Sequence, residues 1–224
     1  MRGGPSEGAD PRLAELEAVL FDLDGTLIDS IELILASFRH ATETVLGEAL
    51  PDEAMLSGVG MPLARQMREF SEEHADELLR VYREHNGRMH DSLVRAYPEV
   101  PETLVWLASR GYRMGVVTSK MNAMARRGLA VFDLARFFDV VVGSDDVTVH
   151  KPDPHPLLVA AAELVVAIER CAYVGDSVHD MAAARAAGCV AIGATWGVST
   201  REALVEAGAE YVIEGMGELK GLLE

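Results

Sequence analysis

Two aspartates separated by one residue are the first candidates for chemistry in this chain. Asp22 lies in the apolar run AVLFDL (18–23), which stops at Asp24 as a buried strand ending in a sharp turn would. Side chains two positions apart on an extended segment point the same way, so these two carboxylates would repel each other in one site. A hard cation such as Mg²⁺ relieves this repulsion and prefers oxygen ligands. The pair therefore predicts a metal-assisted reaction.

Three later apolar runs also end near reactive side chains. Thr118 and Ser119 close the run YRMGVVTS, Lys151 follows the run FFDVVVGS after a short loop, and Asp176 lies in CAYVGDS with Asp180 one turn later. Ligands of parallel α/β sheets bind outside the carboxyl ends of the strands, so we expect these side chains to meet. Asp176 would add a third oxygen ligand and Lys151 a fixed positive charge. Such a pocket suits a phosphoryl group.

The elements that must position these residues alternate between strand and helix after Pro101. The spacing predicts helices over 102–110 and 179–188, further helices from about 122, 154 and 217, and strands over 112–119, 137–144, 171–177, 189–194 and 210–213. Together with the first strand they predict an α/β fold, a Rossmann-like three-layer core with a parallel sheet and helices on both faces.

Residues 28–95 have a different pattern. Apolar residues recur at helical spacing over 30–46, 62–70 and 72–89, and no strand pattern interrupts them. We therefore predict an all-helical cap domain over 28–95, inserted into a core made of 18–27 and 96–224. Residues 1–17 begin with glycine, proline and charged side chains, and we predict a flexible leader there.

Composition limits the classes of partner. The 224 residues carry a formal net charge of −16, which argues against nucleic acid, because clustered Lys and Arg bind its phosphates. No apolar stretch reaches the roughly 20 residues that cross a bilayer, and no signal peptide is evident, so we expect no membrane partner and a cytoplasmic location. Cys171 and Cys189 lack the spacing of a zinc site and are predicted to be reduced core thiols. A monomer and a homodimer remain equally open.

Four short motifs, in order, resemble those of the haloacid dehalogenase superfamily. They are DLDGT at 22–26, the Thr or Ser at 118–119, the isolated Lys151 before proline, and GDSxxD at 175–180. Coincidence of the whole set is about 5% or less. The resemblance covers residues 18 to 195, and the helical block lies where this superfamily inserts a helical cap. The chain is most similar to the phosphoglycolate phosphatase and pyrophosphatase-like branch, for example in SDDVTVHKPDP.

This resemblance implies roles for the core residues. Asp22 would attack phosphorus and form an aspartyl-phosphate, and Asp24 would act as general acid and then general base. Mg²⁺ would be held by Asp22, the backbone carbonyl of Asp24 and Asp176. Lys151 would bind phosphate oxygens, while Asp180 would orient Lys151 or a metal-bound water.

Other residues are expected to complete the phosphate site. The hydroxyl of Thr118 is the first choice for a phosphate oxygen, with Ser119 as its neighbour, and backbone N–H groups around Gly25 and Ser119 would assist. Arg65 of the cap would contact the remote end of the substrate, at about even odds with an ordinary exposed charge. The roles of His150 and His179 stay open.

The predicted function is a Mg²⁺-dependent phosphatase acting on a small phosphorylated metabolite. 2-Phosphoglycolate is the leading substrate, and inorganic pyrophosphate is the alternative. A sugar phosphomutase would share the nucleophile and the second aspartate, but the cap shows no resemblance to those enzymes. A catalytically silent binding protein would usually lack one of the key carboxylates, and all of them are present here.

Overall fold

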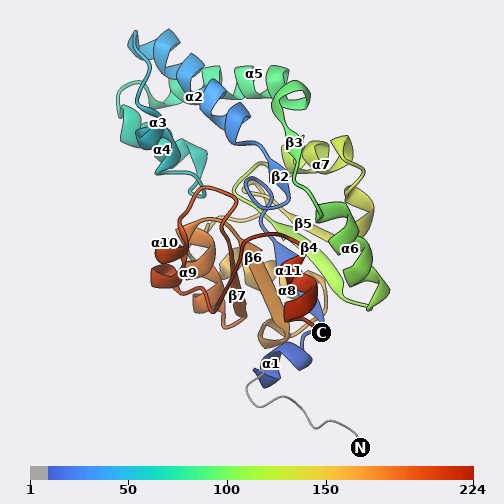
Figure 1. The fold of residues 1–224 in the computed structure, drawn as a ribbon. Helices are drawn as coiled ribbons and strands as arrows, with labels where there is room; N and C mark the ends of the chain where they lie inside the picture. Colours follow the sequence, from blue (N-terminus) through green and yellow to red (C-terminus); the bar gives the residue numbers. More distant parts are fainter. Residues whose placement is uncertain (1–9) are drawn as a thin grey trace, which may run out of the picture.

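Six parallel strands form the central sheet of the computed structural model, which describes residues 10–224 (Figure 1). The order across the sheet is β5-β4-β1-β6-β7-β8, and every neighbouring pair is parallel. The strands are β1 (Ala18–Phe21), β4 (Arg113–Val117), β5 (Val140–Val142), β6 (Cys171–Gly175), β7 (Val190–Ala194) and β8 (Tyr211–Ile213). After β5 the chain crosses from one side of β1 to the other and forms β6, and ligands bind at such a reversal point.

Helices cover both faces of the sheet. The alternation of side chains along β1 shows why, since Ala18 and Leu20 join the buried cluster on one face while Val19 and Phe21 join the cluster on the other. One face packs against α6 (Val100–Ser109), α7 (Asn122–Val131) and α11 (Glu218–Leu222), and the other against α8 (His155–Glu163), α9 (Val178–Ala187) and α10 (Arg201–Ala207). Short 3₁₀ turns lie at Ala135–Phe137 and Ile168–Arg170. The predicted three-layer α/β core is confirmed.

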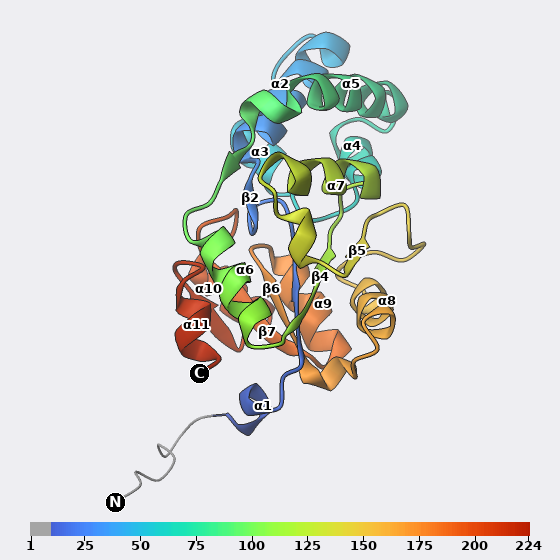
Figure 2. The same cartoon turned by 90° about the vertical axis from the view of Figure 1, so that its right-hand side faces the viewer.

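A second group of helices packs around its own core, and Figures 1 and 2 show it at the carboxyl end of the sheet. It contains α2 (Ile31–Leu46), α3 (Asp52–Leu56), α4 (Leu63–Phe70) and α5 (Ala75–Leu93). Phe38 lies at its centre, with ring centroids 5.4 Å from Phe70 and 4.7 Å from Tyr82. We call residues 28–95 the helical unit. No helix within residues 10–224 is long and apolar enough to span a membrane.

Two short strands lie where the chain enters and leaves the helical unit. β2 (Ile28–Asp29) and β3 (Arg95–Ala96) pair antiparallel, with Ile28 opposite Ala96. The expectation that 28–95 contains no strand was therefore wrong at its ends. A strand of two residues is too short to show an alternating pattern, and only its partner from far along the chain defines it. The pair holds the two connections side by side (Figure 1).

Residues 10–17, the described part of the predicted leader over 1–17, include a short helix. Residues 1–9 lie outside the described part of the chain, but α1 (Pro11–Ala14) forms a helical turn capped by the side chain of Asp10. The hydroxyl of Tyr211 donates to Asp10 at 3.1 Å, and Arg12 pairs with Glu210. These partners are about 200 residues away in the sequence, so local composition gives no sign of them.

Candidate active site

Three of the predicted site residues follow adjacent strands. Phe21 pairs with Val116 of β4 on one side and Val174 of β6 on the other. Asp22, Thr118 and Asp176 therefore leave the sheet at the same edge, and all three are buried. The backbone N–H of Asp22 still donates to the carbonyl of Val174 at 2.9 Å, which fixes its position at the end of β1. The structure brings these residues together as expected.

Lys151 reaches this edge from the loop after β5, and its side chain is 2% exposed. Its Nζ donates to Oδ1 of Asp22 at 3.0 Å, Oδ1 of Asp180 at 2.6 Å and the hydroxyl of Tyr173 at 2.9 Å. Burial opposes its charge, but the carboxylates of Asp180 and Asp22 outweigh it and raise the pKa of Lys151. Lys151 is therefore a permanent cation beside Asp22.

Asp180 holds Lys151 in place and is itself held by the start of α9. Its Oδ1 accepts from Lys151, and its Oδ2 accepts from the N–H of Ser177 at 3.0 Å and from the Ser177 hydroxyl at 2.6 Å. Ser177 and Asp180 form the reciprocal capping box that begins this helix. Both carboxylate oxygens are thus occupied, an arrangement that suits the predicted orienting role.

Asp176 is fixed by two donors and by two glycines. Thr26 Oγ1 donates to its Oδ1 at 3.0 Å, and the N–H of Val198 donates to its Oδ2 at 2.9 Å. A Cβ on Gly25 or Gly197 would lie 2.3 or 2.1 Å from Oδ2, which no side chain permits. Gly25 also has φ of 81°, in the left-handed region that favours glycine. The DGT turn and the loop after β7 therefore shape the space around this carboxylate.

The buried carboxylates fit a divalent cation. One carboxylate oxygen each of Asp22, Asp176 and Asp180 lies within 4.8 Å of the others. Burial, together with the charges of Asp180 and Asp24, raises the pKa of Asp22 to about 7. Burial and the charges of Asp22 and Asp180 raise the pKa of Asp176 well above its ordinary value. Asp180 accepts from the Lys151 ammonium and twice from Ser177, whereas each oxygen of Asp176 accepts one hydrogen bond from a neutral donor and Oδ2 of Asp22 accepts none from residues 10–224. Asp22 and Asp176 are therefore the side chains that best suit a hard cation.

Asp24 lies between the sheet and the helical unit. Its Oδ1 accepts from the hydroxyl of Ser30 and from Nζ of Lys120, both at 2.6 Å. Burial alone would raise the pKa of Asp24, but the positive charge of Lys120 and both hydrogen bonds lower it. Its Oδ2 takes no hydrogen bond from residues 10–224. One oxygen of this carboxylate is therefore fixed and the other is available to a substrate.

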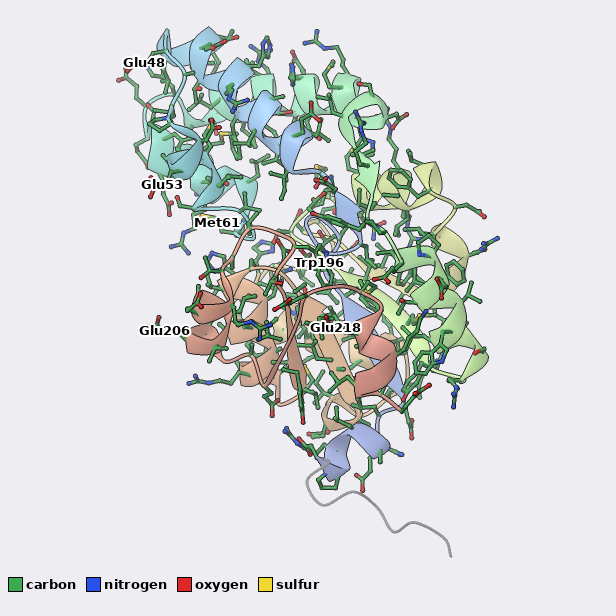
Figure 3. All side chains as sticks on the ribbon, viewed as in Figure 1. Glu48, Glu53, Met61, Trp196, Glu206 and Glu218 are labelled. Atoms are coloured by element: carbon green, nitrogen blue, oxygen red, sulfur yellow. The ribbon has the colours of Figure 1, made fainter. Side chains whose placement is uncertain are left out.

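A loop of the helical unit lies against the site. The hydroxyl of Ser119 donates to the carbonyl of Gly60 at 2.5 Å, so it is engaged there and only its N–H remains for an anion. Gly60 has φ of 100°, and a Cβ at this position would lie 2.7 Å from Oγ of Ser177. Figure 3 shows the adjoining Met61 at the edge of the helical unit that faces the core, and Trp196 on the core side of this boundary.

Arg65 is not brought to the site. Its side chain on α4 is 64% exposed and pairs with Glu69 at 3.3 Å, as an i,i+4 helix pair does. The helix turns this side chain to solvent, and the expected contact between Arg65 and the substrate stays a prediction. His179 is half-buried near Gly60, and burial lowers its pKa. His150 is half-buried beside Lys151.

Sequence reasoning missed three members of the site, namely Lys120, Ser30 and Tyr173. Tyr173 lies in the middle of β6, where an aromatic residue is ordinarily core, yet its hydroxyl contacts Lys151 and the carbonyl of Val117. The composition of the chain could have pointed to Lys120 as a site residue. The chain has only three lysines, and two of them, 120 and 151, follow strand ends in the predicted sheet.

Comparisons with known proteins agree with this arrangement. The family model described as haloacid dehalogenase-like hydrolase matches residues 19–194. The pyrophosphatase PpaX of Bacillus velezensis is 38% identical over 202 residues, which cover 90% of this chain and 94% of that protein. This similarity spans both the sheet and the helical unit.

Solved structures show the same architecture. A proposed haloacid dehalogenase-like hydrolase of Bacteroides fragilis superposes with a TM-score of 0.86 at 27% identity, covering 91% of this chain and 99% of that one. A proposed phosphoglycolate phosphatase of Lactobacillus plantarum superposes with a TM-score of 0.83 at 25% identity, covering 92% and 99%. The chain belongs to the haloacid dehalogenase-like hydrolase family and is a phosphatase of that family.

Proposed function

We propose that this chain is a Mg²⁺-dependent phosphohydrolase in which Asp22 is transiently phosphorylated. One observation carries the proposal. Asp22 is a buried carboxylate at the reversal point of the sheet, bonded at 3.0 Å by a buried lysine, with the carboxylate of Asp24 two residues later. A nucleophile, a fixed cation and a second carboxylate at one strand end are the groups that an acyl-phosphate mechanism needs.

The two carboxylates divide the reaction between them. A carboxylate oxygen of Asp22 forms a bond to phosphorus while the bond from phosphorus to the leaving oxygen breaks, which gives an aspartyl-phosphate. Asp24 takes up a proton as the doubly charged phosphoryl group binds beside it, because added negative charge raises the pKa of a carboxyl group. It donates this proton to the leaving oxygen and then takes a proton from the water that attacks the aspartyl-phosphate. Inorganic phosphate leaves and Asp22 is restored. Such proton transfer typically contributes about 10²–10⁴-fold to the rate.

Charge and hydrogen bonds from the chain hold the phosphoryl group. Lys151, kept in place by Asp180, offers its ammonium group to a phosphoryl oxygen. The hydroxyl of Thr118 accepts from the N–H of Lys120 at 3.2 Å, so its proton remains free to donate. The N–H of Ser119 takes part as predicted, whereas the N–H of Gly25 is not available, because it donates to the carbonyl of Ile28 at 2.9 Å. These groups stabilise negative charge on phosphoryl oxygens in a site where little water screens them.

Asp22, Asp176 and the backbone carbonyl of Asp24 would hold Mg²⁺. The fit is supported by the raised pKa values of Asp22 and Asp176, because buried carboxylates that repel each other favour a bound cation. When bound, Mg²⁺ supplies positive charge that neutralises the phosphoryl oxygens and aligns them for attack.

Mg²⁺ is expected to stabilise the protein more at about pH 8 than at about pH 5.5. The pKa of Asp22 is about 7 in the folded protein, above its value of about 4 in the unfolded chain. Protonated Asp22 therefore contributes its full stability below about pH 4, and this contribution is lost as the pH rises through about 7. At pH 8 the metal replaces the missing protons. At about 100 times its Kd it adds about 2.7 kcal/mol, or on the order of 5–10 °C in Tm.

Thermal denaturation with Mg²⁺ or with EDTA at both pH values measures this difference. The variant Asp176→Asn is the control, and it should lose most of the gain in Tm at pH 8. An equal gain at both pH values would contradict the assignment of the metal to these carboxylates.

We also propose that the helical unit, residues 28–95, is a cap over the core formed by 18–27 and 96–224. The contact between Ser119 and Gly60 and the position of the Gly60 backbone against Ser177 support this role. A cap that closes in this way excludes water from the reacting groups and presents its own side chains to the substrate. The β2–β3 pair is then the connection about which the cap moves.

Pyrophosphate is the substrate that we propose first. The support is the pyrophosphatase name of a relative that is 38% identical over nearly the full length of both chains. This reverses the order predicted from the sequence, in which 2-phosphoglycolate came first. Phosphoglycolate remains the second candidate, with the Lactobacillus plantarum structure as its support.

A phosphate-release assay with Mg²⁺ tests the proposed function. We expect pyrophosphate to be hydrolysed with a higher kcat/KM than phosphoglycolate, and both to exceed hexose phosphates. Addition of EDTA should stop the release of phosphate. If no compound releases phosphate and a hexose phosphate is isomerised instead, the chain is a phosphomutase. If nothing turns over, a binding role replaces the hydrolase.

A further inference from the structure

Lys120 is a largely buried cation that the mechanism above does not use. Its side chain is 12% exposed, and its Nζ lies 2.6 Å from Oδ1 of Asp24. It extends from the turn between β4 and α7, whereas Lys151 contacts Asp22 from the loop after β5. The two lysines thus flank the two carboxylates, one beside the attacking oxygen and one beside the group that protonates the leaving oxygen.

The position of Asp24 defines where the leaving group must lie. A general acid stands about 2.6–3.2 Å from the oxygen that it protonates. Oδ1 of Asp24 is taken by Ser30 and Lys120, so the leaving oxygen meets Oδ2. The ammonium of Lys120 is bonded to the other oxygen of the same carboxylate, which brings it within reach of atoms one or two bonds beyond the leaving oxygen.

Charge in the site favours an additional role for this lysine. Within residues 10–224, the carboxylates of Asp22, Asp24, Asp176 and Asp180 bond only two ammonium groups, those of Lys120 and Lys151. A doubly charged phosphoryl group adds further negative charge, and one Mg²⁺ and Lys151 would balance this charge on the phosphoryl side. On the leaving side, Lys120 is the only lysine or arginine within residues 10–224 that bonds Asp24. Any second anion there would meet this ammonium group.

The use of lysine at this position is selective. The chain carries 20 Lys and Arg residues, of which only three are lysines, and the third, Lys220, pairs with the exposed Glu102. Arginine thus supplies nearly all of the surface positive charge, while lysine is placed at the two buried positions of the site. A lysine ammonium is a compact charge on a flexible stem, and it can contact Asp24 and a substrate anion together.

We propose that Lys120 binds a second anionic group on the leaving side, so that the substrates are phosphate compounds whose leaving group itself carries a negative charge. Phosphoanhydrides and phosphate esters of small hydroxy acids meet this requirement, whereas esters of neutral alcohols do not. The inference rests on the proposed function and defines the substrate class of the same site. Lys120 is in this sense a residue that determines specificity.

A matched pair of substrates tests the inference. 2-Phosphoglycolate and 2-hydroxyethyl phosphate differ only in that a CH₂OH group replaces the carboxylate. We expect the wild type to prefer phosphoglycolate, and Lys120→Met to lower this ratio of kcat/KM values by about 10- to 100-fold, as loss of a charge-assisted hydrogen bond does. Lys120→Arg should keep most of the preference. Pyrophosphate turnover should fall together with that of phosphoglycolate.

The ratio separates this role from a structural one. If Lys120 acts only on Asp24, both substrates lose activity equally in Lys120→Met and the inference is wrong. The thermal transition of Lys120→Met shows whether this variant folds. If it does not fold, the ratios of the wild type and of Lys120→Arg test the inference instead. A wild type without preference for the carboxylate overturns the inference. Failure of the proposed function would be recognised by a different result, namely activity that survives Asp22→Asn.

Discussion

Replacing Asp22 by asparagine is expected to lower kcat by about 10⁴-fold or more, as loss of a covalent nucleophile does in other enzymes. The amide has nearly the same shape but is a poor nucleophile, so the aspartyl-phosphate cannot form. The fold should persist, because the substitution removes a buried carboxylate whose pKa is raised to about 7. Phosphate release with pyrophosphate and Mg²⁺ measures the activity, and thermal denaturation with EDTA measures the stability.

The same substitution at an exposed site provides the control. Asp139 is 58% exposed, lies 3.8 Å from Arg113 and is not part of the cluster of buried carboxylates. Asp139→Asn should keep wild-type kcat. Asp22→Asn that retains more than about 1% of the activity would show that another group attacks phosphorus.

The strands of the sheet were predictable because each one is strongly marked in the sequence. All six runs predicted as strands, including the short one at 210–213, form strands of the sheet. Each run is apolar, is bounded by turns and alternates with a helix, and β1 buries all four of its residues. The β2–β3 pair and the contacts of Arg12 could not be predicted in this way, because each depends on a partner distant in sequence.

The positions of site residues were predictable where a residue follows a strand, and less so where the helical unit contributes. Asp22, Lys151 and Asp176 converge because parallel strands end at one edge. The orientation of a helix about its own axis, by contrast, is set by packing, and packing turns Arg65 to solvent. Ser30, which bonds Asp24, lies at the start of the helical unit and resembles an ordinary helix cap in the sequence.

The hydroxyl of Ser119 illustrates a further limit. Its place after β4 predicts that the hydroxyl binds an anion, but the hydroxyl donates its hydrogen bond to the carbonyl of Gly60 instead. No local pattern reveals that competition, because the loop belongs to another unit. Similarly, Lys120 is visible in the sequence only as a rare residue type, and its contact with Asp24 requires the turn before α7 to direct it inward.

Lys151→Met is expected to destabilise the metal-free protein by about 3–5 kcal/mol at pH 8 and to lower kcat at least as strongly as loss of a general acid, about 10²-fold or more. The substitution leaves Asp22 and Asp180 buried beside each other with no cation. Without Lys151 the raised pKa of Asp22 rises further and the lowered pKa of Asp180 also rises, so the variant takes up protons as the pH falls. Its loss of stability should therefore shrink between about pH 8 and pH 5.

Urea denaturation at both pH values, with EDTA present, measures the change in the free energy of unfolding. Lys151→Met combined with Asp180→Asn is the matched variant, because it removes one of the two uncompensated charges and should recover part of the stability without recovering activity. A single variant as stable as wild type at pH 8 would show that water or a rearranged side chain compensates the carboxylates. A double variant that regains activity would show that Lys151 only supports the fold and does not bind the phosphoryl group.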